Sequence, residues 1–369
     1  MSEDQLLTSP LHERHRALNA KMADFGGWEM PIEYPGGGVL REHQAVRERV
    51  GIFDVSHLGK ATVVGPGAAD FVNACFTNDL RKVTPPKAQY TMCCDEETGG
   101  VVDDLIQYIK SDDDVFLIPN CANTAEVVRR MREKLPEGLT LTDVHRDYGI
   151  IAVQGPRSEE VVAALGLPTD LEYMSYADAT WQGLPMTVCR TGYTGEKGFE
   201  LVVPWEATAD VWDALTEAMA PYDGLPCGLG ARDTLRTEMG YALHGHELSL
   251  DITPNMARAG WAVGWGKEAF WGKEVLAEQK AAKTCRLSWG LLVEGRGIPR
   301  KDCLVKDEEG HEIGVVTSGT MSPTLRQGIA LCLLDRGVSE GQRVVIDVRG
   351  RDVAAVVTKP PFVRTQVAD

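Results

Sequence analysis

The stretch Ile150-Ile-Ala-Val-Gln-Gly-Pro156 predicts a β-strand that ends at a Gly-Pro pair and leads into an apolar-periodic helix over residues 158–165. An earlier stretch, Ala61-Thr-Val-Val-Gly-Pro66, has the same form and leads into a helical pattern over residues 68–75. The two Gly-Pro pairs lie 90 residues apart. The chain therefore contains one kind of strand–turn–helix unit twice.

A second pair of segments recurs in the same order. Val115-Phe-Leu-Ile-Pro119 precedes a helical pattern through Met131, and Phe199-Glu-Leu-Val-Val-Pro204 precedes one through Leu215. Their prolines are 85 residues apart, which nearly repeats the first offset. Two units in the same order predict two similar α+β lobes. Coincidence is the alternative, because strand–proline–helix junctions are common.

Helices are also expected before residue 61. Thr8-Ser-Pro10 is typical of a helix start, with a hydroxyl cap and a proline at the first helical position, and apolar residues extend the pattern as far as Met22. A second helix is predicted over residues 40–50. It should end at Gly51, in the left-handed cap conformation, with a strand over residues 52–55 after it.

The sequence changes character near residue 284. Short β-rich runs alternate with Gly, Pro and charged turns, over residues 288–293, 313–317, 329–334 and 343–348. Such spacing is typical of a small antiparallel barrel or sandwich. The segment 273–283, rich in Glu, Lys and Ala, predicts a helix that leads into it.

Composition limits the function classes. At 369 residues the chain should form two or three domains, and its net charge of −16 argues against a nucleic-acid or anionic membrane surface. The apolar runs are too short to span a bilayer, and the acidic N-terminus lacks an apolar signal region. The nine cysteines form no Cys-x-x-Cys pair, which favours reduced thiols and a cytoplasmic location.

Two adjacent acids lie inside a predicted strand, Gly99-Gly-Val-Val-Asp-Asp-Leu-Ile-Gln-Tyr-Ile109. Successive strand side chains point to opposite faces, so Asp103 and Asp104 should not form a close carboxylate pair. Asp104 should share its face with Val102 and Tyr108. A carboxylate in apolar surroundings needs partners or a function, because burying the bare charge is costly. The alternative is a solvated acid pair that flanks a turn.

Other polar motifs remain ambiguous. The glycine-rich stretch 190–200 lacks the Walker and dinucleotide spacings, so either a plain hairpin or a ligand-facing loop is possible. Arg232 and Arg236 lie on one face of a predicted helix, where they could bind an anion or pair with neighbouring acids. The segment His244-Gly-His-Glu247 lacks a metal-binding spacing, and no metal is expected. Without a nucleotide, metal or nucleophile motif, an organic cofactor should supply the chemistry.

Taken together, these segments resemble the glycine cleavage system T-protein (aminomethyltransferase) family over essentially the whole chain. The resemblance rests on ordered motifs, namely Phe25-Gly-Gly-Trp-Glu-Met-Pro31, Gly51-Ile-Phe-Asp-Val-Ser-His57, Thr77-Asn-Asp79, Lys87-Ala-Gln-Tyr90, Gly99-Gly-Val-Val-Asp-Asp-Leu105, Arg190-Thr-Gly-Tyr-Thr-Gly-Glu196, Gly228-Leu-Gly-Ala-Arg-Asp233, Thr317-Ser-Gly-Thr-Met-Ser-Pro-Thr-Leu325 and Lys359-Pro-Pro-Phe362.

The resemblance implies an α+β protein with a three-domain cloverleaf fold around a central opening. Two interleaved α+β lobes are expected, the first from residues 1–58 with 145–230. The second, from residues 59–144 with 231–281, should carry the catalytic acid. A C-terminal antiparallel β-barrel domain should occupy residues 282–369.

The resemblance also implies the reaction. The enzyme should move the aminomethyl carbon from the dihydrolipoyl sulfur of the lipoyl-bearing H-protein to tetrahydrofolate, releasing ammonia and forming 5,10-methylenetetrahydrofolate in glycine catabolism. Tetrahydrofolate is the expected co-substrate, and no metal, nucleotide, nucleic acid or membrane is expected to take part.

The family's site residues map onto positions in this sequence. The catalytic acid corresponds to Asp104, which would either accept a proton from folate N10 or only orient it. The expected folate-binding residues are Tyr90, Tyr108, Asn120, Tyr193, Glu200, Arg232, Tyr241, Trp261 and Arg364. The tyrosines offer flat surfaces, Asn120 a donor and an acceptor, Glu200 an acceptor, and Arg364 a cation for the glutamate tail.

Two relatives of the same fold are the alternatives. One is a folate-dependent demethylase of a small sulfonium or methylamine substrate, whose pterin pocket would be much the same. The other is a non-enzymatic folate-binding accessory protein for iron–sulfur assembly. Its motif carries a cysteine at the position of Gly192, which argues against it here.

Overall fold

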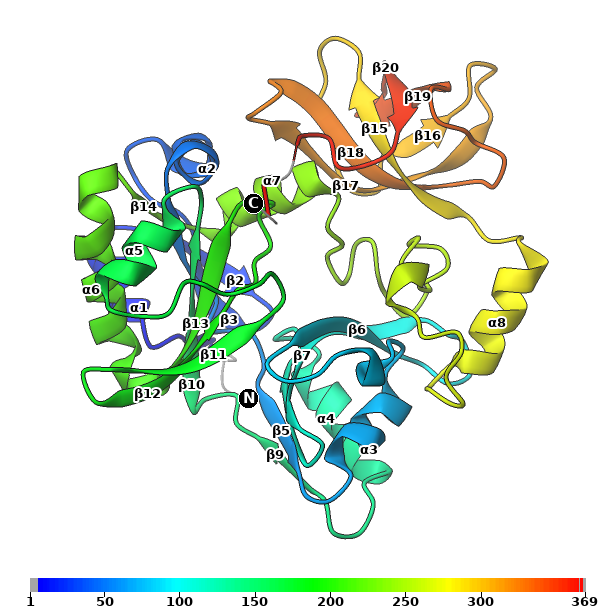
Figure 1. The fold of residues 1–369 in the computed structure, drawn as a ribbon. Helices are drawn as coiled ribbons and strands as arrows, with labels where there is room; N and C mark the ends of the chain where they lie inside the picture. The colour runs from blue at the N-terminus through cyan, green and yellow to red at the C-terminus, as the bar shows by residue number, and fades with distance from the viewer. Residues whose placement is uncertain (1–5, 365, 368–369) are drawn as a thin grey trace, which may run out of the picture.

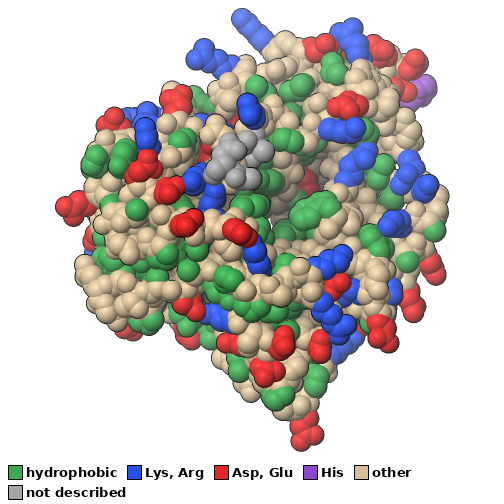
Figure 2. All heavy atoms as spheres, in the orientation of Figure 1, with side chains coloured by type: hydrophobic (Ala, Val, Ile, Leu, Met, Phe, Trp, Pro, Cys, Tyr) green, Lys and Arg blue, Asp and Glu red, His purple; other side chains and the backbone are tan. Residues whose placement is uncertain are grey.

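The computed structural model describes residues 6–364, 366 and 367, which form three packed bodies (Figure 1). We call them the first lobe, which contains a six-stranded sheet, the second lobe, which contains a five-stranded sheet, and the barrel. The bodies surround the middle of the molecule, and Figure 2 shows a hollow between them with hydrophobic side chains at its edge. The α+β class and the closed C-terminal barrel confirm the expected fold.

The first lobe is built on a sheet with the strand order β11-β12-β13-β10-β4-β14. Its strands are β4 (Gly51–Asp54), β10 (Tyr148–Gln154), β11 (Tyr176–Trp181), β12 (Leu184–Cys189), β13 (Gly198–Pro204) and β14 (Leu225–Cys227). Helices α5 (Ser158–Ala164) and α6 (Thr208–Met219) pack on one face, where Val153, Leu201 and Trp212 belong to one core.

A small N-terminal sheet and two helices complete this lobe. They are β1 (Leu7–Thr8), β2 (Lys21–Phe25), β3 (Trp28–Glu33), α1 (His12–Ala17) and α2 (Gly38–Glu48). Strand β3 lies between β1 and β2, and α2 packs against β14 and β4. The N-terminal segment therefore covers the first lobe rather than forming a body of its own.

The second lobe has the strand order β6-β7-β8-β5-β9. Its elements are β5 (Ala61–Val64), α3 (Ala68–Cys75), β6 (Ala88–Cys94), β7 (Val101–Ser111), β8 (Asp114–Ile118), α4 (Thr124–Glu133) and β9 (Thr140–Asp143). The two sheets pack through a shared core that joins Phe53, Ala152 and Val202 of the first lobe to Tyr108 and Phe116 of the second.

The duplicated unit predicted from the sequence is present in both lobes. β5 pairs antiparallel with β8 in one sheet, and β10 pairs antiparallel with β13 in the other. The glycines of the two Gly-Pro turns also match, since Gly65 has φ 129° and Gly155 has φ 127°. A side chain at either position would be strained, because this backbone conformation favours glycine. One supersecondary unit therefore supplies the centre of both lobes.

The barrel closes in the order β15-β18-β17-β16-β19-β20. Its strands are β15 (Leu287–Val293), β16 (Leu304–Lys306), β17 (Glu312–Ser322), β18 (Gln327–Leu334), β19 (Arg343–Val348) and β20 (Arg351–Thr358). Helix α8 (Lys273–Ala282) leads into it, as the sequence predicts. Four short 3₁₀ helices complete the fold, η1 (Leu80–Lys82), η2 (Trp205–Ala207), η3 (Ala220–Tyr222) and η4 (Gly260–Ala262).

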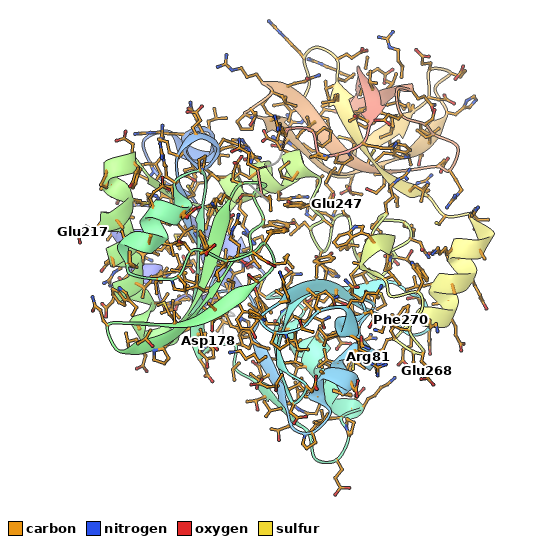
Figure 3. All side chains as sticks on the ribbon, in the orientation of Figure 1. Arg81, Asp178, Glu217, Glu247, Glu268 and Phe270 are labelled. Carbon is orange, nitrogen blue, oxygen red and sulfur yellow. The ribbon has the colours of Figure 1, made fainter. Side chains whose placement is uncertain are left out.

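Helix α7 (Leu229–Met239) joins the first lobe to the barrel. It packs against α2 and β3 on one side and against β17 and β18 on the other (Figure 1). Its two buried charges are paired, because Arg236 Nη1 lies 2.8 Å from Glu247 Oε2 and Glu238 Oε2 lies 2.8 Å from Arg47 Nη2. Figure 3 labels Glu247 beside the middle of the molecule.

Three local predictions are wrong. Pro10 is not the first helical residue, because α1 begins at His12 with Leu11 as its N-cap and Thr8 lies in β1. The first helix ends at Ala17, and Met22 lies instead in β2, where it pairs with Pro31 of β3. Gly51 does not take a left-handed cap conformation but begins β4. A side chain at Gly51 would lie 2.6 Å from Cys227 Sγ, so close packing and not helix termination requires the glycine.

Among the described residues, no helix combines the length and hydrophobicity that crossing a bilayer requires. All nine cysteines fall within this part of the chain, and none forms a disulfide.

Candidate active site

The carboxylate of Asp104 is held on strand β7 by two side-chain donors. Tyr90, on the neighbouring strand β6, donates its hydroxyl to Oδ2 at 2.9 Å. Asn120, which follows β8, donates from Nδ2 to Oδ1 at 3.0 Å. The side chain of Asp104 is partly exposed. The acid is thus fixed in orientation while a ligand can still reach it.

A β-bulge changes the strand alternation next to this acid. The pairing register shifts between Cys93 and Cys94 of β6, which leaves Val102 as the extra residue on β7. Val102 packs in the core of the second lobe. The prediction that it shares a face with Asp104 is therefore wrong.

Asn120 contacts both acids of the pair. Its Nδ2 lies 3.0 Å from Oδ1 of Asp103 and 3.0 Å from Oδ1 of Asp104, and it also reaches the backbone oxygen of Asp104 at 2.9 Å. Its amide nitrogen is therefore already engaged within the protein. The expectation that Asn120 offers a ligand both a donor and an acceptor needs correction, because its donor holds the acids.

Burial is the largest cause of the pKa shifts of Asp103 and Asp104. Removal from water raises the pKa of Asp104 above the ordinary value, although hydrogen bonds from Tyr90 and Asn120 and the charge of His244 oppose the rise. Burial and the charge of Asp104 likewise raise the pKa of Asp103. Asp104 can therefore accept a proton at a pH closer to neutrality than a solvated aspartate can.

An aromatic stack lies beside the acid. The ring of Tyr90 stacks on Trp261 of η4, with 5.2 Å between centroids and 25° between planes. Trp261 is 72% exposed, which is unusual for so large an apolar side chain. Burial raises the pKa of the Tyr90 hydroxyl, so it stays protonated and keeps donating to Asp104. The stack offers a flat surface next to the carboxylate.

Glu200 and Arg232 bring opposite charges to the other side of the site. Glu200, on β13, accepts a hydrogen bond from Thr191 Oγ1 at 2.5 Å. Burial lowers the pKa of the Arg232 guanidinium, whereas the charge of Glu200 raises it. The two groups are therefore close enough to interact electrostatically. Nη1 of Arg232 is buried and has no hydrogen-bond partner among the described residues. A guanidinium with an unused buried donor can bind an oxygen-rich ligand.

Two stacked tyrosines lie beside Arg232, and one of them interacts with the charge of Asp104. Tyr193 stacks on Tyr241 with 5.7 Å between centroids, and Arg232 lies 4.7 Å from the centre of the Tyr193 ring. Burial raises the pKa of Tyr193, and the charge of Asp104 adds to that rise. The loop that carries Tyr193 needs Gly192, because a side chain there would lie 2.2 Å from Gln154 Oε1.

Tyr108 and Arg364 lie at the two extremes of exposure. Tyr108 is 2% exposed, and its ring lies 5.7 Å from that of Tyr176 in the core between the lobes. The charge of Glu200 adds to the burial that raises its pKa. Arg364 is exposed on the segment after β20. Tyr108 therefore has little surface to offer a ligand, whereas the Arg364 side chain is accessible.

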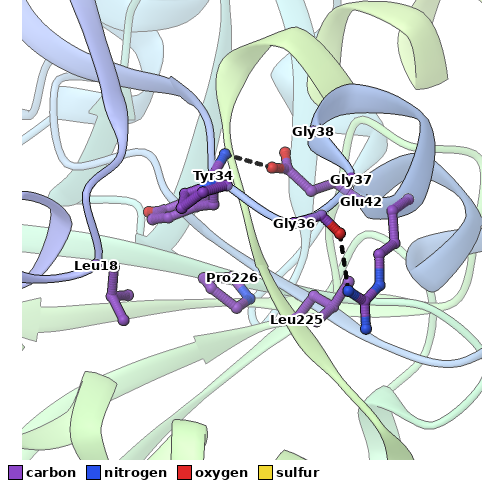
Figure 4. A pocket seen from close by; sticks show the side chains of 10 residues that line it. Leu18, Tyr34, Gly36, Gly37, Gly38, Glu42, Leu225 and Pro226 are labelled. Atoms are coloured by element: carbon purple, nitrogen blue, oxygen red, sulfur yellow. Dashed lines mark hydrogen bonds between the residues drawn. The ribbon is translucent and has the colours of Figure 1, made fainter.

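A cavity of about 250 Å³ adjoins Tyr193 and Arg232. Its wall also includes apolar side chains and an acid beside the arginines, namely Phe25, Leu229, Asp233, Arg236, Leu243 and His246. A second cavity of about 140 Å³ lies in the first lobe beside Tyr34 and Glu42, and Figure 4 shows Tyr34 N donating to Glu42. None of the predicted site residues lines that second cavity.

Two polar residues at the site, Thr191 and Asn123, were not found from the sequence, and Asp103 was placed on the face opposite to Asp104. Thr191 binds Glu200, while Asp103 and Asn123 lie behind Asn120. Asn123 comes three positions after Asn120, just beyond a predicted strand. This spacing could have indicated a polar cluster. Within residues 6–364, 366 and 367, no group of three or more His, Cys, Asp or Glu is placed to hold a metal ion.

Two family models match this chain. The GCVT N-terminal domain matches residues 11–267, and the glycine cleavage T-protein C-terminal barrel domain matches residues 286–364. Together they cover the two lobes and the barrel.

Relatives match over nearly the full length. An aminomethyltransferase of Parafrankia sp. (strain EAN1pec) is 62% identical over 359 residues, which cover 97% of this chain and 98% of the relative. One of Mycobacterium tuberculosis H37Rv is 57% identical over 363 residues, covering 97% of each chain. The crystal structure of glycine cleavage system aminomethyltransferase T from Bartonella henselae superposes with a TM-score of 0.91 at 31% identity, covering 98% of this chain and 99% of that one.

Proposed function

The chain belongs to the glycine cleavage T-protein family and is an aminomethyltransferase, and from this premise we propose its substrates. It takes the aminomethyl carbon from the dihydrolipoyl sulfur of the lipoyl-bearing H-protein and passes it to tetrahydrofolate. The carbon–sulfur bond breaks, ammonia and the reduced lipoyl thiol leave, and 5,10-methylenetetrahydrofolate forms. The observation that carries this proposal is the Asp104 carboxylate, fixed by Tyr90 and Asn120 beside an aromatic stack.

The residues around Asp104 suit a reduced pteridine. The stacked rings of Tyr90 and Trp261 offer a flat apolar surface, and Glu200 offers acceptor oxygens for amino and ring N–H groups. The unused donor of Arg232 suits an oxygen of the same ligand. Tyr193 and Tyr241 would flank the p-aminobenzoate part, with Tyr108 below.

Bound tetrahydrofolate supplies the nucleophilic amine and a second amine for ring closure. Asp104 serves the step in which that second amine loses its proton, either as the acceptor or by orienting the amine. Its pKa, raised by burial above the ordinary value of an aspartate, makes the carboxylate a better proton acceptor than a solvated one. Tyr90 and Asn120 hold the carboxylate in one orientation. Less conformational freedom is therefore lost when the substrate binds.

We also propose three domains with the boundaries expected from the sequence. The first lobe takes residues 1–58 with 145–230, the second lobe with the catalytic acid takes residues 59–144 with 231–281, and the barrel takes residues 282–369. We also propose that transfer takes place in the cytoplasm, because nine unpaired thiols are typical of a reducing compartment.

Arg364→Ala is expected to weaken binding of folate with a long glutamate tail. An exposed guanidinium can bind tail carboxylates, and losing one charge-assisted bond costs about tenfold in affinity. Titrations should compare monoglutamyl and polyglutamyl tetrahydrofolate. Arg351→Ala, another exposed arginine of the C-terminal body, is the matched control. An equal loss for both folates would contradict a role in tail binding.

Ammonia release tests the proposed function. The protein is mixed with aminomethylated H-protein, with and without tetrahydrofolate, and ammonia and methylenetetrahydrofolate are measured. Both products should form together and only with folate. If the charged carrier gives no release but methylated sulfonium or amine compounds turn over, the protein is a demethylase. Folate binding without any turnover would indicate an accessory protein.

A further inference from the structure

Asp103 lies directly behind the reactive acid and is fully buried. Its carboxylate accepts three N–H groups: Asn120 N binds Oδ2 at 2.9 Å, Asn120 Nδ2 binds Oδ1 at 3.0 Å, and Asn123 Nδ2 binds Oδ1 at 2.7 Å. Both oxygens therefore accept, and the three N–H groups fix the orientation of this carboxyl group.

These bonds tie β7 to the turn that precedes α4. Strand β8 ends before Pro119, and the backbone oxygen of Asn120 accepts from Asn123 N at 3.1 Å and Thr124 N at 3.0 Å. Asp103 thus fixes the loop on which Asn120 sits. Since the same Asn120 nitrogen holds Asp104, the position of one acid determines that of the other.

We propose that Asp103 is a positioning residue, which orients the Asp104 carboxylate through the shared Asn120 amide. This inference rests on the proposed function, because Asp104 must take part in the transfer. The strand alternation had placed Asp103 on the face of the sheet opposite to Asp104, and so had given it no part in the reaction.

Tyr90 and His244 lower the pKa of Asp104, whereas the charge of Asp104 raises the pKa of Asp103 and of Tyr193. Four titratable groups therefore interact with Asp104. They are Tyr90 from β6, Asp103 from β7 itself, Tyr193 from the loop after β12, and His244 from the segment after α7. Of these, Asp103 is the carboxyl group joined to Asp104 by one nitrogen. Removing an acceptor from Asp103 should therefore loosen the Asn120 amide that binds Asp104.

Asp103→Asn in the full chain tests the proposal. The amide cannot accept from all three N–H groups, so Asn120 loses its anchor and Asp104 its orientation. We expect kcat to fall about tenfold or more, while KM for tetrahydrofolate stays within threefold. Because the Asn120 hydrogen bond lowers the pKa of Asp104, loosening it should move the acid limb of the kcat profile to higher pH. Asp112→Asn, an exposed aspartate of the same lobe, should change neither.

Two variants at Asn123 keep the test decisive if Asp103→Asn does not fold. Asn123→Ala removes one donor but leaves the contacts of Asn120, so the acid limb should stay in place. Asn123→Asp puts another carboxylate beside Asp103, and the limb should move to higher pH. An unmoved limb in Asn123→Asp, or Asp103→Asn behaving like Asp112→Asn, would overturn the proposal. Absence of ammonia release by the wild-type protein would instead refute the proposed function.

Discussion

Asp104→Asn is expected to lower turnover by about 10²- to 10⁴-fold while tetrahydrofolate affinity changes no more than a few fold. The replacement keeps the size of the side chain and its position beside Tyr90 and Asn120. It removes the negative charge that can accept or attract a proton. Steady-state kinetics with charged H-protein, together with folate titrations, measure the two quantities separately.

The pH profile gives the same experiment a second readout. Burial raises the pKa of Asp104, so wild-type activity should fall as pH drops through that raised value, above the ordinary range of an aspartate. The variant has no such group and should lose this acid limb. Asp112→Asn, which removes an exposed carboxylate from the same lobe, should keep full turnover and the limb. Unchanged turnover in Asp104→Asn would show that the acid is structural.

Glu238→Ala is expected to lower the free energy of unfolding by about 3–5 kcal/mol, because it breaks a buried ion pair and leaves Arg47 with Glu196 as its one acidic partner among the described residues. Glu238 is fully buried on α7 between the first lobe and the barrel. It accepts from Arg47 at 2.8 Å and from Ser322 at 2.5 Å, and it lies 3.2 Å from His43 Nε2. Urea unfolding followed by tryptophan fluorescence and circular dichroism would measure the loss.

The direction of the pH effect follows from the pKa of Glu238. Burial would raise it, but hydrogen bonds and charges from His43 and Arg47, together with the Ser322 hydroxyl, lower it to about 2, below its usual 4.5. A lowered carboxyl pKa contributes stability above the unfolded-state value, and this contribution is lost as pH falls from about 4.5 to about 2. The variant should therefore lose less stability than the wild type across this window.

Glu340→Ala is the matched control in the barrel. Glu340 pairs with Lys359 at 3.1 Å, but both side chains are exposed, and such pairs contribute little. Equal unfolding curves for Glu238→Ala and wild type would contradict the view that α7 fastens the barrel through this buried charge.

The repeated architecture could be predicted because it depends on local patterns. Strand runs that end at Gly-Pro turns mark both lobes, and the matching φ angles of Gly65 and Gly155 show that the two turns share one conformation. The barrel strands likewise follow apolar runs between turns. Met22 was assigned wrongly because pairing with Pro31 of β3 overrides a weak helical pattern.

The site was less accessible to sequence reasoning. Strand alternation separated Asp104 from Asp103, yet it could not show that Asn120, 16 residues after Asp104, returns to bind both acids. The bulge at Val102 has no sequence signal of its own. The roles of Tyr90 and Glu200 came from the family resemblance, since nothing local links them to an acid on another strand.

A crystal structure of the protein with tetrahydrofolate bound tests the central claim most directly. The account predicts that the pteridine lies between the three bodies, next to the Tyr90 ring and within reach of Glu200, with its bridging amine hydrogen-bonded to Asp104. A pteridine bound elsewhere, or an Asp104 carboxylate turned away from it, would contradict the account.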